Sequence, residues 1–280
     1  MSLAIAKDTR IAVIGGGKMG EAIMGGWIGA EDGLAAVLGP ENFVVANPGE
    51  ARRTYLTETY GVSCVRTAAE IDEADIVLIS VKPQKMSEVL PVLAARPFAA
   101  TAFYISVVAG WTCERIEDAL GGQARLCRLM PNTPLLVGCG ATAVSTGSAA
   151  SDDEAALVRD LFSCLGKAWI VDERQIDAVC AISGSGPAYV AHLIEALAGM
   201  GPEIGLDRDL AEQLALQTVL GTAQLMVQRH QSAEKTRIDV SSPGGTTLAA
   251  LDAMDDAGFT ASLEEGVRAA IRRADELGKM

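Results

Sequence analysis

The sequence is poor in aromatic residues, in histidine and in positive charge. Aromatic residues make up only 4% of the 280 positions, so a folded core has to be built from Ala, Val, Leu and Ile. The formal net charge of −13 argues against nucleic acid and anionic membranes as partners, because both are bound through basic surfaces. The two histidines, His192 and His230, are too isolated to predict a metal site, so we expect no bound metal.

Long apolar runs and paired cysteines are also missing. No uncharged apolar stretch reaches the about 18–20 residues of a membrane span without glycines or polar residues clustered inside it. The six cysteines form no C-x-x-C pair, and several lie in apolar runs, which is typical of reduced core cysteines. Residues 1–9 are too short and too polar for a secretory signal. These absences predict a cytoplasmic protein with no membrane partner.

A glycine-rich turn near the amino terminus organises the rest of the sequence. An apolar run over 11–14 leads to Gly15, Gly17 and Gly20, and residues 18–28 are predicted to be helical. In this strand–turn–helix context, G-x-G-x-x-G is the pattern of a dinucleotide-binding turn. We expect Gly15 to form the tight turn, Gly17 to admit a pyrophosphate and Gly20 to let the helix pack closely. A purely structural turn is the alternative interpretation.

Alternating strands and helices follow as far as Asp172. The strands are predicted over 11–14, 43–46, 61–64, 75–81, 102–108, 125–130, 141–145 and 168–171. We therefore predict an α/β fold with an N-terminal Rossmann-like doubly wound sheet over 1–172 and an all-helical C-terminal domain over 173–280. The helical part is too apolar to cover itself, so we expect a homo-oligomer. A self-contained bundle docked on the sheet is the alternative.

The end of the second predicted strand bears on the choice of cofactor. Proteins that prefer NAD usually have Asp or Glu here to hold the ribose 2′-OH, but this chain has Asn47. A carboxylate would repel a 2′-phosphate, whereas an amide with Arg52 and Arg53 nearby would accept it. We therefore predict NADPH as the preferred cofactor, with NADH as the alternative. The alternative interpretation is that Arg52 and Arg53 are ordinary solvated charges of a helix.

Two further strand ends are candidates for contact with the cofactor. The run over 75–81 stops at Lys82-Pro83, and the run over 102–108 stops at Ala109-Gly110. Open α/β sheets bind ligands at the carboxyl ends of their strands. Lys82 is placed to contact a phosphate or ribose, and the small residues leave room for a nicotinamide ring. The predicted cofactor-binding residues are Gly15, Gly16, Gly17, Lys18, Met19, Asn47, Val81, Lys82, Pro83, Ala109 and Gly110.

Residues 239–247, Asp-Val-Ser-Ser-Pro-Gly-Gly-Thr-Thr, are the most unusual stretch of the C-terminal half. We expect exposed N–H groups at Gly244 and Gly245 and the start of a helix near Thr246. Backbone donors, hydroxyl donors and a helix N-terminus together predict a receptor for a carboxylate. The structural alternative is a helix cap with a flexible glycine linker.

Six short motifs are spread over nearly the whole chain. They are Gly-Gly-Gly-Lys-Met-Gly over 15–20, Val-Lys-Pro over 81–83, Ser-Val-Val-Ala-Gly over 106–110, Met-Pro-Asn-Thr-Pro over 130–134, Ser-Gly-Ser-Gly-Pro-Ala-Tyr over 183–189 and Val-Ser-Ser-Pro-Gly-Gly-Thr-Thr over 240–247. With these motifs the chain resembles the pyrroline-5-carboxylate reductases. The first motif is generic, whereas the last two, in this order and at this spacing, are specific to that family.

This resemblance implies hydride transfer from NAD(P)H to the imine carbon of L-1-pyrroline-5-carboxylate, which gives L-proline. It implies a Rossmann domain and a helical domain that interlocks two subunits, often in a ring of five dimers. In the family, the Ser-Pro-Gly-Gly-Thr-Thr loop holds the substrate carboxylate. By resemblance, the substrate-binding residues here are Ser242, Gly245, Thr246 and Thr247. The acidic residue just after the last strand lines the substrate pocket, and here it is Glu173.

The chemistry of a cyclic imine agrees with this assignment. A protonated imine is already an electrophile, so it needs a hydride donor held at about 3–3.5 Å and a carboxylate clamp more than a strong acid. Thr247 is the catalytic candidate for a hydrogen bond to the ring nitrogen, and Glu173 is the candidate that favours its positive charge. Asp239 and Thr67 depart from the Asn that many members of the family have at these positions.

A β-hydroxyacid dehydrogenase and a non-catalytic dinucleotide-binding sensor are the two alternatives to the reductase. The β-hydroxyacid dehydrogenases have a similar first turn and helical second domain, but they rely on a lysine in that domain. This chain has no lysine from Ala168 to Glu234, so the acid/base of that chemistry would be missing. A non-catalytic dinucleotide-binding sensor stays open, because a fold does not by itself imply catalysis.

Overall fold

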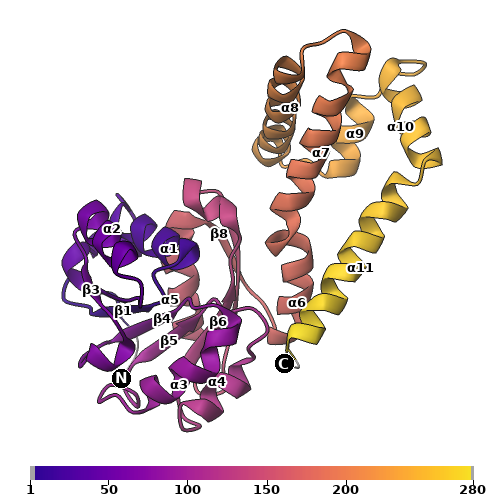
Figure 1. Ribbon diagram of the computed structural model, residues 1–280. Coiled ribbons are helices and arrows are strands. Elements are labelled where there is room, and N and C mark those ends of the chain that lie inside the picture. Colours follow the sequence, from indigo (N-terminus) through magenta and orange to yellow (C-terminus); the bar gives the residue numbers. More distant parts are fainter. Residues whose placement is uncertain (1–3, 279–280) are drawn as a thin grey trace. The chain divides into compact units, whose positions relative to one another are not determined.

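The computed structural model describes residues 4–278, which contain one eight-stranded sheet (Figure 1). Its strands are β1 (Ile11–Ile14), β2 (Phe43–Ala46), β3 (Ser63–Val65), β4 (Ile76–Ile79), β5 (Phe103–Ser106), β6 (Arg125–Met130), β7 (Gly140–Thr146) and β8 (Gly166–Ile170). They lie in the order β3-β2-β1-β4-β5-β6-β7-β8, and only β6 and β7 pair antiparallel. The strand order reverses between β1 and β4, as in a doubly wound fold. The predicted Rossmann-like architecture is confirmed.

The central strand β1 shows why the strands are continuous apolar runs. All four of its residues are buried. Ile11 and Val13 belong to one buried cluster, and Ala12 and Ile14 belong to another, because successive side chains point to opposite faces of a sheet. The first cluster is completed by α1 (Lys18–Ile28), α2 (Glu50–Tyr60) and α5 (Asp152–Phe162), and the second by α3 (Met86–Ala94) and α4 (Cys113–Ala119). Helices therefore cover both faces.

Trp27 fixes α1, the helix that follows the glycine turn. Its side chain is fully buried, and its ring lies 5.3 Å from that of Phe162 in an edge-to-face arrangement. The indole Nε1–H donates to the carbonyl oxygen of Leu161 at 3.1 Å, so the polar atom of this large side chain is satisfied. These contacts attach α1 to α5 on one face of the sheet.

The antiparallel pairing of β6 and β7 follows from the length of their connection. Residues 131–139 contain only a 3-10 turn over Thr133–Val137. A parallel return needs a crossover of about a dozen or more residues, usually with a helix, so the chain folds straight back. β8 then pairs parallel to β7, after α5 has provided the crossover. The sequence predicts both strands but not their relative direction.

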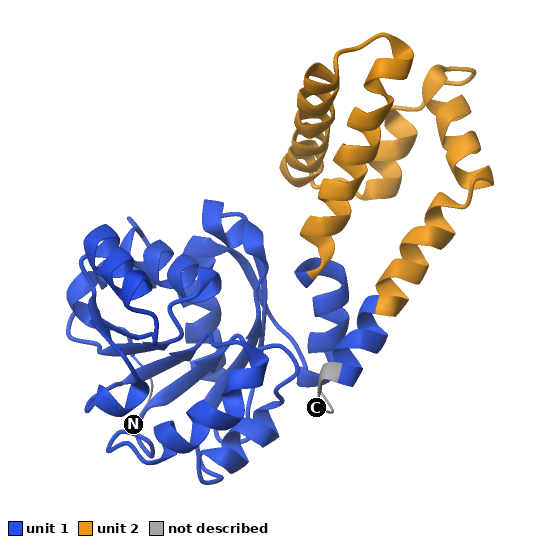
Figure 2. Ribbon diagram, in the orientation of Figure 1, with its two compact units in different colours: residues 1–184, 270–280 blue, residues 185–269 orange. Residues whose placement is uncertain are grey.

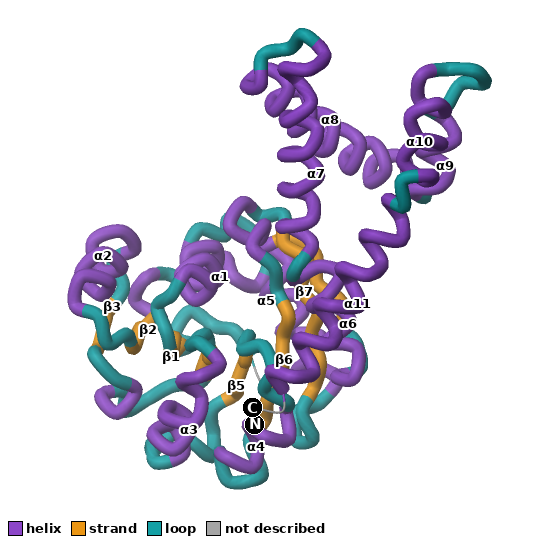
Figure 3. The backbone as a smooth tube through the Cα atoms, turned by 45° about the vertical axis from the view of Figure 1, so that its right-hand side comes forward, coloured by secondary structure: helices purple, strands orange, loops and turns teal. Residues whose placement is uncertain are grey.

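The chain divides into two compact units, one formed by residues up to 184 together with those from 270 onward, and one formed by 185–269 (Figure 2). The first unit also contains the short α6 (Ile176–Val179). The second is helical (Figure 3) and contains α7 (Gly186–Met200), α8 (Arg208–Arg229), α9 (Ala233–Asp239), α10 (Thr246–Asp256) and the first part of α11 (Phe259–Gly278). The domain boundary at residue 172 stays a prediction.

The helix α9 is an element that the sequence analysis did not assign. Ser232 caps it, since its side-chain oxygen accepts a hydrogen bond from the N–H of Lys235 at 3.2 Å. The signal was therefore local, a serine before a run of good helix formers. Among the described helices, none is long and apolar enough to cross a lipid bilayer.

Candidate functional site

The turn after β1 has the geometry that its glycines allow. Gly15 has a φ of +103°, which residues with a side chain rarely adopt. A Cβ atom at this position would lie 2.8 Å from the carbonyl oxygen of Ser80. The N–H of Gly15 donates to the carbonyl oxygen of Ala46 at 3.0 Å. The turn is therefore wedged between the ends of β2 and β4, at the point where the strand order reverses.

Gly20 allows α1 to approach the strand ends closely. A Cβ here would lie 2.3 Å from the carbonyl oxygen of Gly15 and 2.5 Å from Oγ of Ser80. Ser80 also donates its hydroxyl hydrogen to the carbonyl oxygen of Gly15 at 2.8 Å. The close packing expected for Gly20 is present, and Ser80 is a residue of this turn that the sequence analysis missed.

Gly17 occupies the open side of the same turn. It is exposed, it precedes the first residue of α1, and no atom lies within 4 Å of its Cβ position. No side chain caps the helix, so backbone N–H groups of the first turn are available to an anion. Lys18 is exposed, whereas Met19 is partly buried and packs against the core.

Asn47 lies at the end of β2, on the other side of the turn from Ser80. Its backbone N–H donates to the carbonyl oxygen of Val65 at 3.0 Å, and its side-chain Nδ2 donates to that of Gly49 at 3.4 Å. The side chain is partly exposed and carries no charge. Asn47 therefore still supports the expectation that this strand end tolerates a 2′-phosphate.

Both arginines that follow Asn47 bind main-chain carbonyl groups. Arg52 donates from Nε to the carbonyl oxygen of Gly16 at 2.6 Å. Arg53 donates from Nη1 to the carbonyl oxygens of Asn47 and Pro48 at 2.9 and 2.7 Å. The interpretation of these side chains as ordinary solvated helix charges is therefore wrong. They tie α2 to the turns that precede it, through partners too distant or too irregular for a sequence pattern to show.

Trp111 joins the turns that follow β4 and β5. Its Nε1–H donates to the carbonyl oxygen of Pro83 at 3.2 Å, and its ring lies 4.2 Å from the guanidinium carbon of Arg115. Arg115 in turn donates to the carbonyl oxygen of Gly110 at 3.4 Å, and Gly110 has a φ of +76°. The predicted cofactor residues of the two turns are thus brought side by side. Lys82, in the turn after β4, is exposed.

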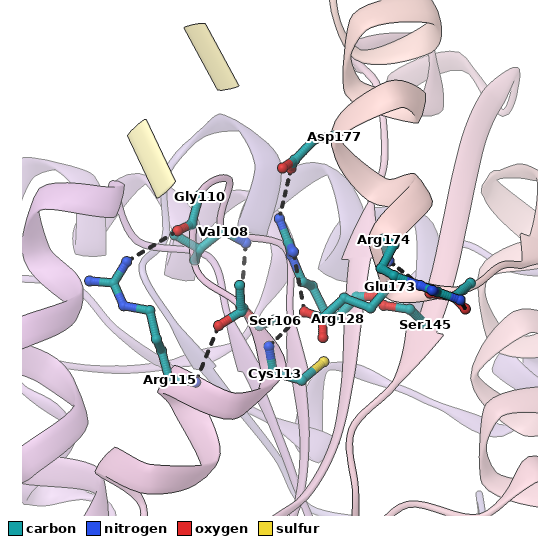
Figure 4. A network of polar contacts seen from close by, with 12 residues as sticks. Ser106, Val108, Gly110, Cys113, Arg115, Arg128, Ser145, Glu173, Arg174 and Asp177 are labelled. Atoms are coloured by element: carbon teal, nitrogen blue, oxygen red, sulfur yellow. Dashed lines mark hydrogen bonds and ion pairs between the residues drawn. The ribbon is translucent and has the colours of Figure 1, made fainter. Parts of the chain in front are cut away.

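Glu173 is held in place by a buried arginine and a backbone N–H (Figure 4). Its Oε1 accepts from the N–H of Cys113 at 2.7 Å and from Nη1 of Arg128 at 3.2 Å. The side chain of Arg128 on β6 is only 4% exposed, and its Nη2 also pairs with Oδ1 of Asp177 at 3.2 Å. Burial, followed by the charge of Glu173, raises the pKa of the Cys113 thiol. A buried guanidinium requires such carboxylate partners, and the two contacts on Oε1 hold the side chain of Glu173 in one orientation.

The loop before α10 lies in the second unit. The N–H of Gly245 donates to the carbonyl oxygen of Ser242 at 2.9 Å, and Gly244 has a φ of +70°. The expectation of an exposed N–H at Gly245 is therefore wrong, because the turn itself uses this group. No side chain caps α10, so its first N–H groups, beginning at Thr246, are the backbone donors available to a carboxylate. Ser242 and Thr246 are exposed, and Thr247 is partly buried.

The predicted residues thus belong to two units. The first contains all the cofactor candidates and Glu173, whereas the second contains Ser242, Gly245, Thr246 and Thr247. Within the first unit, the turns after the parallel strands β1, β2, β4 and β5 gather at one edge of the sheet. The residues that the sequence analysis missed there are Ser80, Trp111, Arg115 and Arg128.

Two family models match this chain. The one described as pyrroline-5-carboxylate reductase dimerisation covers residues 173–277, and the one described as NADP oxidoreductase, coenzyme F420-dependent, covers residues 10–110. The first of these supports a homo-oligomer. The second matches the part of the chain that contains the glycine turn and the ends of β2, β4 and β5.

Relatives resemble the chain over nearly its whole length. The pyrroline-5-carboxylate reductase of Synechocystis sp. is 42% identical over 274 residues, which cover 96% of this chain and 98% of the relative. That of Arabidopsis thaliana is 37% identical over 275 residues, covering 98% and 97%. The solved reductase from Coxiella burnetii is 32% identical with a TM-score of 0.87 and covers 98% of this chain and 100% of its own. The Plasmodium falciparum reductase, solved with NADP bound, is 27% identical with a TM-score of 0.85 and covers 98% and 99%. The chain belongs to the pyrroline-5-carboxylate reductase family, as its motifs predict.

Proposed function

We propose that this protein reduces L-1-pyrroline-5-carboxylate to L-proline, with NADPH as the preferred hydride donor. Its family supports the reaction, and the NADP-bound relative from Plasmodium falciparum supports the cofactor. NADPH, when bound, supplies the hydride that forms the new C–H bond at the imine carbon, and the C=N double bond becomes a single bond. The protein then has to hold an anionic substrate and orient its ring.

The observation that carries the proposal is the uncapped N-terminus of α10 with its Ser-Pro-Gly-Gly-Thr-Thr loop. The first N–H groups of this 11-residue helix have no side-chain cap, and the hydroxyl-bearing residues Ser242 and Thr246 beside them are exposed. A helix N-terminus favours a negative charge, and N–H and O–H donors match the lone pairs of a carboxylate. We assign this loop to the substrate carboxylate, with Gly245 shaping the turn rather than donating.

The glycine turn of the first unit fits a dinucleotide. Gly17 leaves its surroundings open to 4 Å, so a pyrophosphate can approach the backbone and the first N–H groups of α1. Gly16 has no such room, because a Cβ there would lie 2.6 Å from Cδ1 of Leu56 and 3.0 Å from Cγ1 of Val45. We assign Asn47 to the ribose that carries the 2′-phosphate of NADPH. We assign the turns at Val81–Pro83 and Ala109–Gly110 to the rest of the cofactor.

We assign the catalytic roles to Thr247 and Glu173. The hydroxyl of Thr247 would hydrogen bond the ring nitrogen, and the carboxylate of Glu173 would favour the positive charge of the protonated imine. The contacts of Glu173 with Cys113 and Arg128 both use Oε1, so this carboxylate is oriented before any substrate binds. Pre-oriented charges stabilise a developing charge without reorganisation during the reaction.

The assembly and the location of the protein are part of the same proposal. We propose a homodimer formed through the helical segment 173–280, and a decamer built from five such dimers. Exposed apolar side chains on α8, among them Leu214, Leu216 and Leu220, support burial of this segment by a second copy. Light scattering that gives a 29.1 kDa particle would refute the dimer. We also propose a cytoplasmic location, which fractionation of cells would test.

The test of the reaction is the oxidation of NADPH in the presence of L-1-pyrroline-5-carboxylate, with L-proline identified as the product. We expect kcat/KM to be higher with NADPH than with NADH. A protein that binds NADPH but does not oxidise it with this substrate would refute the reductase and favour a dinucleotide sensor. Preference for NADH would refute the interpretation of Asn47 only.

The role of Thr247 is tested by a pair of variants. We expect Thr247→Val, which keeps the shape but removes the hydroxyl, to lower kcat/KM about a hundredfold, as is typical for loss of an oriented proton or hydrogen-bond donor. Thr247→Ser keeps the hydroxyl and is expected to retain most of the activity. NADPH affinity should be unchanged in both. Equal activity of the two variants would show that the hydroxyl is not used.

A further inference from the structure

Arg52 on α2 binds the backbone of the glycine turn from a position 36 residues further along the chain. Its Nε donates to the carbonyl oxygen of Gly16 at 2.6 Å. The helix α2 packs directly on this part of the turn, since a Cβ on Gly16 would lie only 2.6 Å from Cδ1 of Leu56. The arginine therefore acts on a backbone segment that has little freedom to move away.

Glu21, in the first turn of α1, holds the other side of the guanidinium. Nη2 of Arg52 pairs with Oε2 of Glu21, and the hydroxyl of Tyr60 donates to Oε1 at 3.1 Å. The side chains of Arg52 and Glu21 are 30% and 15% exposed. Burial raises the pKa of Glu21, but the hydrogen bonds from Arg52, Tyr55 and Tyr60 outweigh it and leave the pKa below its usual value. The carboxylate is thus a lasting partner for the guanidinium at neutral pH.

The Gly16 carbonyl and the Gly17 N–H belong to one peptide unit. Because a trans peptide is planar, these two groups point in opposite directions, and the described residues contain no cis peptide bond. When Arg52 holds the Gly16 carbonyl oxygen toward α2, the Gly17 N–H is turned away from α2. Gly17 is exposed and no atom lies within 4 Å of its Cβ position, which leaves room beside this residue for a pyrophosphate. The same orientation keeps a carbonyl oxygen from facing the phosphates.

We propose that Arg52, held by Glu21 and Tyr60, is a positioning residue that aims the Gly17 N–H at the pyrophosphate of the cofactor. The inference rests on the proposed use of a nicotinamide dinucleotide. It differs from the interpretation of Arg52 as a receptor for the 2′-phosphate, because two sides of the guanidinium already bind Gly16 and Glu21. The pyrophosphate is common to NADPH and NADH, so Arg52 supports the binding of both equally.

The test compares Arg52→Met with a matched control, Arg96→Met. Arg96 makes the same kind of contacts elsewhere in the first unit, because its Nε donates to the carbonyl oxygen of Ile71 at 2.9 Å and its Nη2 pairs with Asp72 at 2.6 Å. Neither of these partners belongs to the glycine turn. Dissociation constants for NADPH and for NADH are measured by calorimetry without substrate, together with kcat, KM and the thermal unfolding midpoint.

We expect Arg52→Met to raise both dissociation constants by the same factor, about tenfold, which corresponds to the net worth of one hydrogen bond to a charged group. The turnover number at saturating NADPH should stay within about twofold, since the reacting end of the cofactor is untouched. Glu21→Gln should also raise the dissociation constants for NADPH and NADH by one common factor, which should be smaller than the factor for Arg52→Met. Arg96→Met should lower the unfolding midpoint comparably and leave both affinities as in the wild type.

Three results would overturn the proposal. A loss confined to NADPH would make Arg52 a ligand of the 2′-phosphate. Unchanged affinities would show that the Gly16 contact does not matter for binding. An equal loss in Arg96→Met would mean that general destabilisation is responsible. These titrations need no turnover, so a failure of the proposed reductase activity is detected separately, in the assay with L-1-pyrroline-5-carboxylate.

Discussion

A methyl group added at Gly20 should mainly lower stability, whereas a methyl group added at Gly17 should mainly weaken cofactor binding. In Gly20→Ala the new Cβ would lie 2.3 Å from the carbonyl oxygen of Gly15 and 2.5 Å from Oγ of Ser80. Ordinary contact begins at 3.4 Å, so α1 and the strand end would have to separate by about 1 Å. Overpacking of this kind costs about 1–3 kcal/mol of the free energy of unfolding.

Gly17→Ala meets no such obstacle. Nothing lies within 4 Å of its Cβ position, and its φ of −74° is accessible to alanine. We expect the free energy of unfolding to fall by less than about 1 kcal/mol, because alanine is a poorer residue than glycine before a helix but meets no clash here. The methyl group would, however, stand where the pyrophosphate approaches the turn, so the dissociation constant for NADPH should rise by about tenfold or more.

The two effects are separated by measuring urea unfolding without cofactor and NADPH binding by calorimetry. Gly20→Ala should unfold at a lower urea concentration than Gly17→Ala, which should stay closer to the wild type. Wild-type affinity in Gly17→Ala would refute the assignment of this glycine to the pyrophosphate. Wild-type stability in Gly20→Ala would refute the argument that the close approach of α1 depends on a missing side chain.

Two further predictions concern titrating groups. A hydrogen bond from Arg10 lowers the pKa of Asp75, so this pair adds stability that is fully present above the unfolded pKa of about 3.9 and is lost as the pH falls through the lower folded-state pKa. Asp75→Asn should therefore cost more stability at pH 7 than at pH 3 in urea unfolding, and an equal cost at both values would contradict this. Burial raises the pKa of Cys127 to about 12, whereas Cys139 is exposed. A thiol reagent at pH 8 should label Cys139 rapidly and Cys127 only after unfolding, which peptide mass spectrometry checks.

The parts of the fold that the sequence predicted best are those with a local cause. The strands over 11–14, 43–46 and 125–130 and the helix over 18–28 have the predicted bounds, because apolar runs and glycines mark them directly. The direction of β7 was not predicted, since it depends on how the chain returns and not on the composition of the strand. The glycine turn was predicted because its geometry is required by residues within a single six-residue motif.

The parts of the site that were missed depend on contacts between distant residues. Nothing near Arg52 in the sequence indicates that it reaches Gly16 and Glu21, 36 and 31 residues away. Arg128 likewise meets Glu173 across 45 residues. In the sequence, such charged residues cannot be distinguished from those of a solvated surface. Only the folded chain shows that they have fixed partners. The resemblance to a family supplied Glu173 itself but not the arginine that orients it.

Trp111 has a consequence for how this protein can be observed. Its indole donates to the carbonyl oxygen of Pro83 and contacts the guanidinium of Arg115, beside Ala109–Gly110, the turn that we expect to leave room for the nicotinamide ring. Reduced nicotinamide absorbs light in the range in which indole emits, so energy transfer from this residue would report occupancy of the site in real time. The other two tryptophans, Trp27 in the core and Trp169 on the edge strand β8, lie outside these turns. The molecule thus has its own optical reporter at the proposed reaction end of the dinucleotide.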